Sequence, residues 1–190
     1  MGLKERTCRY CKARFVPPAR HPGVRVCSEG CGVALAEKMR AKVERANAAA
    51  ARKDARQRLE SMKGIPELIR EADKAFCAFI RARDEGKPCI CCGRTSDAWT
   101  RGGTWDAGHY RSRGAASHLR YHEDNCHRQL KQCNRRAFDV AAYRANLIER
   151  IGVARVEALE ADNAPHKWTR DELIAIRKHY TEKLKETQQA

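Results

Sequence analysis

Cysteine constrains this chain more than any other residue type. The sequence has ten cysteines, and all but Cys77 fall within residues 8–31 and 89–133. The N-terminus has no hydrophobic signal core and no apolar run is long enough to span a membrane, so we expect a cytoplasmic protein with no membrane partner. In a reducing compartment, clustered cysteines indicate metal ligands before they indicate disulfides.

The first stretch spaces its cysteines as two short pairs. Cys8-x-x-Cys11 is followed by Cys27-x-x-x-Cys31. Four thiolates at this spacing predict a tetrahedral, structural zinc site, although two reduced pairs without metal are the alternative. A module of residues 1–31 buries too little surface to fold alone, so zinc binding would supply the missing free energy.

The second stretch has the order of residues found in zinc-containing HNH nucleases. A Cys89-x-x-Cys92 pair opens it, a hairpin delivers His109, a loop asparagine follows, and Cys133-Asn134 begins a helix. The expected fold class is α+β and mostly helical: a small ββα-metal core (HNH, or His-Me finger) that contains zinc and is flanked by helices, with the N-terminal zinc module ahead of it.

The residue types in this order suit phosphodiester hydrolysis. Such a reaction needs a base to activate water and a divalent ion to neutralise charge at the phosphate. We predict that His109 is the base, because its ordinary pKa is near neutral. Asp106 and Asn134 offer the oxygen ligands that catalytic Mg²⁺ or Mn²⁺ would need. Asn125 is expected to brace the loop that carries His109.

Charge points to a polyanionic partner. The chain carries a net charge of +15, and residues 151–190 contribute none of it. Arg111 and Arg113, just after His109, are predicted to position phosphate. Residues 32–63 lack Gly and Pro between Val33 and Lys63 and predict one long helix, either a charged linker or an arm that tracks DNA. The basic ridge of this helix consists of Lys38, Lys42, Arg45, Arg52 and Arg56.

The remaining sequence predicts scaffold. We divide the chain into the zinc module (1–31), the basic helix (32–63), a nuclease core with a preceding amphipathic helix (64–152), and a C-terminal helical scaffold (153–190). Within the core, residues 119–121 predict a short strand. In the scaffold, Thr169 and Glu172 have the spacing of a helix capping box.

These motifs together resemble the NinG (Rap) family of lambdoid phages. The likeness rests on Pro88-Cys89-Ile90-Cys91-Cys92-Gly93, on Asp106-Ala107-Gly108-His109-Tyr110-Arg111 and on Leu119-Arg120-Tyr121. It implies a phage-encoded endonuclease, acting in the host cytoplasm on branched recombination intermediates such as D-loops and Holliday junctions. It also implies contacts with other phage or host recombination proteins. A homodimer would supply the two active sites that paired cuts across a crossover need.

The sequence departs from the family pattern at two positions. The family usually has a cysteine where this chain has Leu130, so the second zinc would need Cys89, Cys92, Cys133 and a substitute ligand. Cys126 and His127 are the two options for that ligand. The family also carries an asparagine near the start of the next helix, and Asp139 would replace it if that residue binds metal.

Two other interpretations remain open at this point. The departures at Leu130 and Asp139 favour a non-catalytic zinc protein that recognises DNA junctions and recruits other proteins. A general HNH endonuclease that cuts duplex DNA is the third reading. The basic helix argues against sequence-specific cutting, because it offers phosphate contacts and few side chains that read bases.

Overall fold

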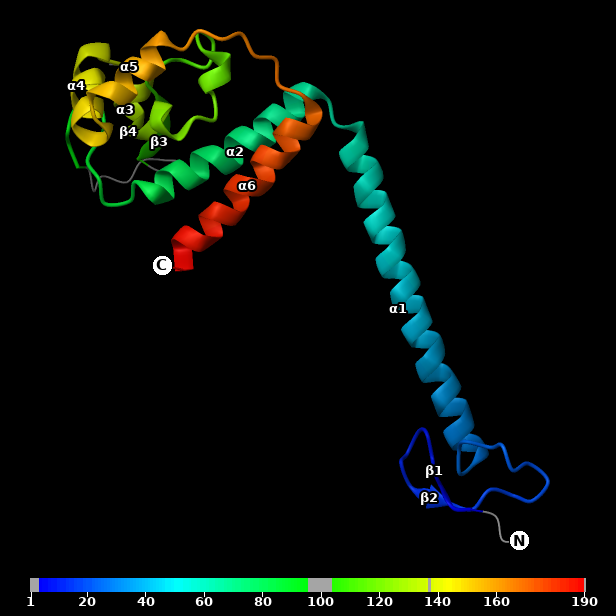
Figure 1. The fold of residues 1–190 in the computed structure, drawn as a ribbon. Coiled ribbons are helices and arrows are strands. Elements are labelled where there is room, and N and C mark those ends of the chain that lie inside the picture. The colour runs from blue at the N-terminus through cyan, green and yellow to red at the C-terminus, as the bar shows by residue number, and fades with distance from the viewer. Residues whose placement is uncertain (1–3, 96–103, 137, 190) are drawn as a thin grey trace. The chain divides into compact units, whose positions relative to one another are not determined.

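The computed structural model describes residues 4–95, 104–136 and 138–189. Contacts divide the chain into two compact units, residues 1–62 and residues 63–190 (Figure 1). Within the described ranges, no helix is both long enough and apolar enough to cross a membrane.

The first unit consists of a small cysteine module and a long helix. Strands β1 (Arg6–Thr7) and β2 (Arg14–Phe15) pair in antiparallel fashion. Helix α1 (Glu29–Met62) confirms the expected helix, and none of its residues is buried. Its many alanines and long charged side chains favour the helical backbone. Intrinsic helix propensity, rather than tertiary packing, therefore stabilises most of this helix.

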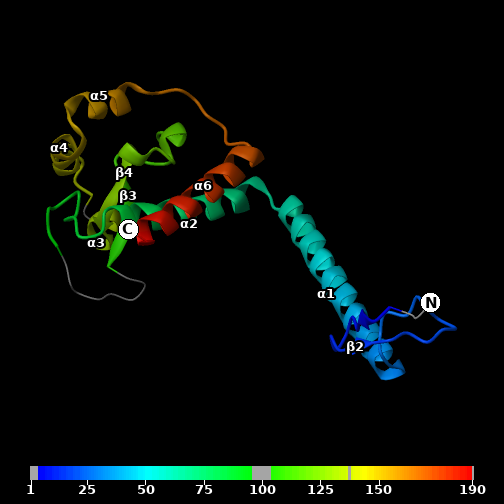
Figure 2. The same ribbon diagram turned by 60° about the horizontal axis from the view of Figure 1, so that its bottom comes forward.

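In the second unit, helices α2 (Ile65–Arg83) and α6 (Arg170–Gln189) lie side by side (Figures 1 and 2). Pro66 stands in the first turn of α2, where its missing N–H is not needed. The expected capping box begins α6: the Thr169 N–H donates to Glu172 at 2.8 Å, and the Glu172 N–H donates back at 3.4 Å. Leucines and aromatic rings of both helices form one of two apolar clusters in this unit.

A two-stranded hairpin lies between these helices and the other cluster. Strand β3 (Trp105–His109) pairs antiparallel with β4 (Cys126–Leu130), and His109 is opposite Cys126. Helix α3 (Lys131–Arg135) follows β4 directly, which produces a strand–strand–helix order. Helices α4 (Val140–Ile151) and α5 (Val153–Ala161) contribute Tyr143, Leu147, Val156 and Leu159 to the second apolar cluster.

One local expectation was wrong. Residues 117–119 form a 3₁₀ turn, and the strand expected at residues 119–121 is absent; the Arg120 N–H bonds to the Ser117 carbonyl, a spacing that extended backbone does not allow. Asp139 caps α4 by accepting from the Ala142 N–H at 3.0 Å. This hydrogen bond satisfies an N–H of the first helical turn. A role of Asp139 as the substitute metal ligand stays a prediction.

The carboxylate of Asp84 joins the end of α2 to the hairpin. It is fully buried and accepts hydrogen bonds from Arg83 (2.8 Å), from Lys87 (3.0 Å) and from the backbone N–H of Arg128 (3.1 Å). Burial opposes its ionisation, but contacts with His127 and Arg83 hold the pKa of Asp84 well below its ordinary value. Asp84 is therefore a buried anion on which neighbouring cations depend.

We predict that Asp84→Asn destabilises the second unit. Loss of the charge leaves the guanidinium of Arg83 without its anion, and breaking such a pair costs about 3–5 kcal/mol. Because the pKa is depressed in the folded chain, the ionised carboxylate stabilises it at neutral pH, and this contribution falls as pH drops below about 4. Urea unfolding of both proteins as a function of pH measures the difference.

The exposed neighbour Glu85 provides the control for this substitution. Glu85→Gln removes the same charge one residue away and should change the free energy of unfolding by less than about 0.5 kcal/mol. Equal unfolding curves for the wild type and Asp84→Asn would contradict the role assigned to Asp84.

Candidate functional site: two cysteine groups and a buried histidine

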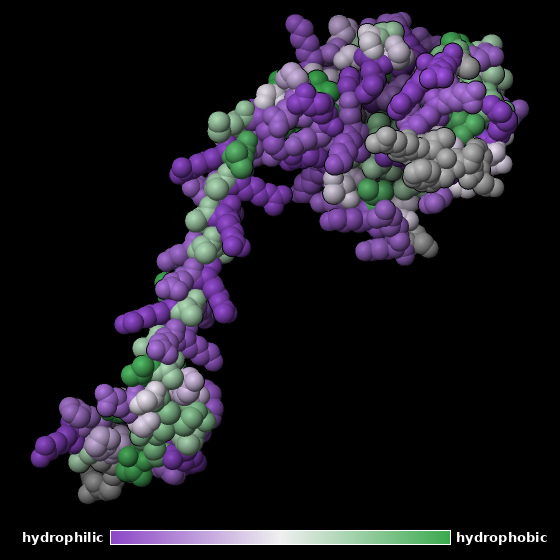
Figure 3. All heavy atoms as spheres, turned by 180° about the vertical axis from the view of Figure 1, so that it is seen from behind, coloured by the Kyte–Doolittle hydropathy of each residue, from purple (hydrophilic) through white to green (hydrophobic). Residues whose placement is uncertain are grey.

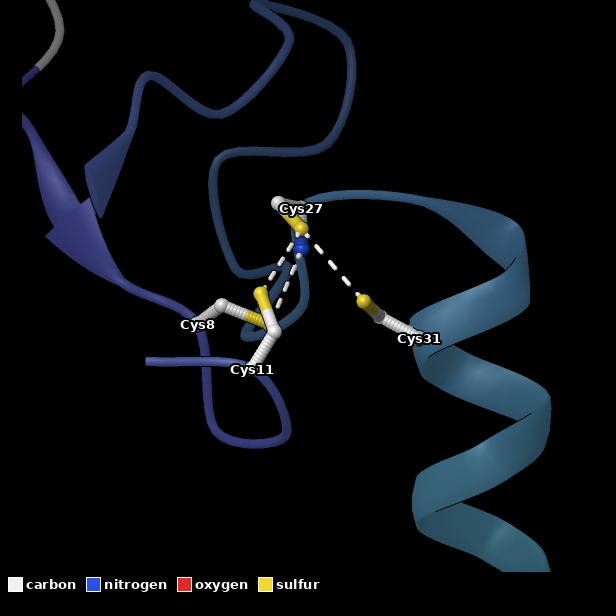
Figure 4. Close-up of side chains that lie close together, drawn as sticks. All are labelled: Cys8, Cys11, Cys27 and Cys31. Atoms are coloured by element: carbon white, nitrogen blue, oxygen red, sulfur yellow. Dashed lines mark hydrogen bonds between the residues drawn. The ribbon is translucent and has the colours of Figure 1, made fainter. Parts of the chain in front are cut away.

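The first cysteine group is assembled as the spacing predicts. Cys8 and Cys11 lie in the loop after β1, and Cys27 and Cys31 flank the start of α1 (Figure 4). Their four sulfur atoms all lie within 4.8 Å of one another, and the Sγ of Cys27 is 3.5 Å from those of both Cys11 and Cys31. This arrangement could hold one zinc ion in tetrahedral coordination.

The pKa values of these thiols also suit a site that binds a cation. Burial opposes ionisation of Cys8, yet hydrogen bonds from the backbone of Cys11 and Cys27 lower its pKa to about 6. Its neighbour behaves in the opposite way: contacts with the Cys11 and Cys31 thiols raise the pKa of Cys27 to about 12. Four thiolates so close together repel one another, and a divalent cation at their centre removes that repulsion.

The second cysteine group contains three of the predicted ligands. The Sγ atoms of Cys89, Cys92 and Cys133 lie within 4.8 Å of one another, with 3.5 Å between Cys92 and Cys133. Gly93 adopts a φ of +68°, and its N–H returns to the Cys89 carbonyl at 2.9 Å, which closes the turn that carries the first pair. This group could also hold zinc, with three protein thiolates.

Neither proposed substitute ligand lies in this second group. The Sγ of Cys126 lies 3.7 Å from Nδ1 of His109, and the ring of His127 contacts Arg83 at 3.0 Å. The side chain of Leu130 packs in the apolar cluster with the cysteines, and its N–H donates to the Cys89 sulfur at 3.3 Å. Leu130 therefore stands beside the group but offers no ligand atom.

His109 ends β3 with both ring nitrogens close to a neighbour. Nε2 lies 2.9 Å from the carbonyl oxygen of Arg120, which can only accept, so Nε2 carries the proton. Nδ1 is then the unprotonated nitrogen, and the Cys126 thiol faces it. Burial lowers the pKa of His109, and burial raises that of Cys126 well above its usual value. At neutral pH the site therefore holds a neutral imidazole and a neutral thiol.

Asn125 makes the bracing contacts that we expected of it. Its Oδ1 accepts from the Arg111 N–H at 2.8 Å, and its Nδ2 donates to the carbonyls of Arg111 (3.0 Å) and Leu119 (3.1 Å). The side chain is fully buried. These bonds clamp the chain just after His109, so Asn125 holds the loop and does not face a substrate.

Asp106 and Asn134 meet each other but not His109. The Asn134 amide donates to the Asp106 carboxylate at 3.1 Å, and Arg135 approaches the same oxygen at 3.2 Å. Asp106 precedes His109 by three residues on β3, so their side chains point to opposite faces of the hairpin, about 10 Å apart along the strand. The structure thus brings together the two residues expected to hold Mg²⁺ or Mn²⁺, on the face of the hairpin opposite His109.

The two arginines after His109 have different surroundings. The guanidinium of Arg111 donates to the carbonyls of Leu159 (2.8 Å) and Asp162 at the end of α5, where a cation satisfies unpaired carbonyls. That placement does not fit a role in positioning phosphate. Arg113 is about half exposed and pairs with Asp73 on α2 at 2.9 Å. Sequence reasoning missed Asp73, because no local motif distinguishes it from an ordinary surface charge.

The basic side chains of α1 are open to solvent. Lys38, Lys42, Arg45, Arg52 and Arg56 are all exposed, and Figure 3 shows hydrophilic side chains along much of this helix. Apolar side chains on it are exposed as well, among them Met39 (58%) and Val43 (57%). Contact with DNA through this helix stays a prediction.

The fold and the cysteine groups define a helix-rich protein with two clusters that could hold zinc. A family model described as "Bacteriophage Lambda NinG protein" matches residues 1–190. The chain belongs to the NinG family.

Individual relatives agree with this assignment. "Protein ninG" of Salmonella phage P22 is 45% identical over 119 residues, which are 62% of this chain and 56% of that protein. The proteins of the same name from Escherichia phage lambda and Escherichia phage 933W are each 43% identical over 119 residues. The matched stretch thus spans a little over half the length of these relatives. No solved structure matches the chain.

The zinc content of cysteine variants distinguishes the first cysteine group, the second cysteine group and Cys126. We expect two zinc ions per chain, one lost in Cys27→Ser and one lost in Cys133→Ser, because each variant removes a ligand from one group. Cys126→Ser should retain both ions, since its sulfur faces His109. Zinc measured per chain by atomic emission checks this. A Cys126→Ser protein with one zinc would show that Cys126 is a ligand after all.

Gly108, the residue before His109, leaves space that a buried side chain fills. A Cβ at Gly108 would lie 1.8 Å from Oε1 of Gln129, whose side chain is fully buried and cannot easily move aside. Gly108→Ala should cost about 1–3 kcal/mol in unfolding free energy. In a Gln129→Ala background the same change should cost less, because Oε1 and Cδ are gone and only the Cβ contact at 3.0 Å remains. Additive effects in this double-mutant cycle would contradict the explanation.

Proposed function

We propose that this chain is an HNH-type DNA endonuclease in which His109 is the general base. The observation that carries the proposal is the orientation of the imidazole. The carbonyl of Arg120 holds Nε2 as the protonated nitrogen, so Nδ1 carries the lone pair that would take a proton from water. A third group that orients the base is typical of catalytic histidines.

The surroundings of His109 define what this chain contributes to the reaction. Nδ1 would accept a proton from the water that attacks phosphorus, once that water replaces the Cys126 thiol as its neighbour. Asn125 keeps the loop after His109 in place during this step. Arg113, half exposed and close enough to affect the pKa of His109, is the described cation best able to meet the phosphate.

A divalent ion, when bound, supplies charge neutralisation at the phosphate and the leaving oxygen. Asp106 and Asn134 have oxygen atoms suited to Mg²⁺ or Mn²⁺, but their position on the opposite face of the hairpin does not fit an ion shared with His109. The metal requirement therefore rests on the family resemblance, and the steps above do not pass through it.

Branched recombination intermediates are the proposed substrate. This part of the proposal rests on membership of the NinG family, together with the net charge of +15. Host cytoplasm as the location, a homodimer that makes paired cuts, and contacts with other recombination proteins belong to the same proposal.

A non-catalytic zinc protein that binds junctions is the second candidate. The burial of His109 and the contact between its Nδ1 and Cys126 favour this reading, because a base must be reached by water and phosphate. Binding of a four-way junction without cleavage by the wild type, with any of Mg²⁺, Mn²⁺ or Zn²⁺ present, would support it over the endonuclease.

Cleavage assays test the endonuclease directly. Purified wild-type protein with Mg²⁺ or Mn²⁺ should nick D-loops and four-way junctions faster than linear duplex of the same sequence. His109→Ala should slow cleavage by about 100-fold or more, since that is the usual contribution of a general base. Zinc content and junction affinity should stay at wild-type values.

The exposed His122 provides the matched control, and His122→Ala should cleave normally. If His109→Ala cleaves as fast as the wild type, the assignment of the base is wrong. Equal rates on linear and branched DNA would instead favour a general duplex endonuclease.

A further inference from the structure

Helix α2 forms one wall of the His109 site, although it lies well before the hairpin in sequence. The ring of Phe76 is 6.0 Å from the imidazole of His109, measured between centroids. Asp73 precedes Phe76 by three residues, so the two side chains share a face of the helix. A carboxylate is thus presented on the side of α2 that borders the histidine.

Asp73 is bound by two arginines from the loop between the strands. Its two oxygens accept from Nε and Nη2 of Arg120 at 2.7 and 2.5 Å, and one of them also accepts from Nη1 of Arg113 at 2.9 Å. The Asp73 and Arg120 side chains are each 18% exposed, whereas that of Arg113 is 49% exposed. The fork of Arg120 is therefore fixed, while Arg113 stays accessible.

Arg120 connects this ion cluster to the base. Its guanidinium is held by Asp73, and its carbonyl oxygen accepts from Nε2 of His109 at 2.9 Å. The same residue thus contacts Asp73 through its side chain and His109 through its backbone. Asp73 is thus linked through Arg120 to the carbonyl that sets the His109 tautomer, although it does not touch the histidine ring.

We propose that Asp73 is a positioning residue for the reaction: it fixes the orientation of His109 through Arg120, and it holds Arg113 ready to receive a DNA phosphate. This inference rests on the proposed endonuclease function. Two guanidiniums and one carboxylate leave one positive charge in the cluster, and one phosphodiester would neutralise it.

The charged groups around His109 predict how its pKa changes when the Asp73 charge is removed. The groups that face His109 are Asp73 from α2, Arg113 and Arg120 from the loop, and the Cys126 thiol from β4. Burial lowers the pKa of His109 most, and the hydrogen bond with the Arg120 carbonyl raises it; the charges of Arg113 and Arg120 lower it, and the charge of Asp73 raises it. Removing the Asp73 charge should therefore lower the pKa of His109, so that the base stays unprotonated at more acidic pH.

The test compares Asp73→Asn with wild-type full-length protein on a four-way junction. We expect kcat to fall about tenfold or more, because misorientation of a catalytic group has effects of this size. Junction affinity without divalent metal should not fall, since one competing negative charge has gone. The acid limb of the pH–rate profile should move to lower pH, and the His109 pKa measured by NMR should move the same way.

Two further variants make the result specific. Asp73→Glu keeps the charge and should retain the wild-type acid limb. Glu67→Gln removes an exposed charge from the first turn of the same helix and should leave kcat and the pH profile unchanged.

The outcomes separate this inference from the proposed function. A folded Asp73→Asn protein with wild-type kcat and an unshifted acid limb overturns the role of Asp73 and leaves the endonuclease intact. A wild type that cleaves no junction overturns the proposed function and the reaction role together. In that case the NMR titration would still show whether Asp73 raises the pKa of His109.

Discussion

The buried carboxylate of Asp84 determines how the second unit is put together. It lies at the end of α2, accepts the backbone N–H of Arg128 on β4, and lies 3.7 Å from Arg150 on α4. The guanidinium of Arg83 beside it also reaches the Cys126 carbonyl at 2.9 Å. One anion with several donors defines the distance between α2 and β4, and with it the surroundings of His109.

The two faces of the hairpin carry different functional side chains. Adjacent residues of a strand point in opposite directions, so His109 and Cys126 lie on one face, with His109 beside Phe76 of α2, while Asp106 and Gln129 lie on the other face. Gly108 is required because Gln129 fills the space where a side chain would be. The alternation explains why residues that lie close together in one sequence motif do not form one site.

The two cysteine groups support folding in different ways. The first brings together four thiols in a unit whose helix buries no residue, so a bound metal would be the main source of tertiary stability available to that unit. The second brings together three thiols inside an apolar cluster that includes Leu130. There the leucine contributes packing at the position where a fourth thiol would contribute a ligand.

The sequence by itself determined the local features of this protein. Cysteine spacing, helix breakers and capping residues act over a few positions, and they correctly predicted the first cysteine group, three members of the second and the long helices. Tertiary structure alone decided the partnerships: Asp73 with Arg113, 40 positions away, Arg111 with the end of α5, and Cys126 with His109 in place of a zinc ion. A charge on an amphipathic helix has the same sequence pattern whether water or a distant arginine binds it. Only the folded backbone brings the partner within hydrogen-bonding distance and so gives the charge its role.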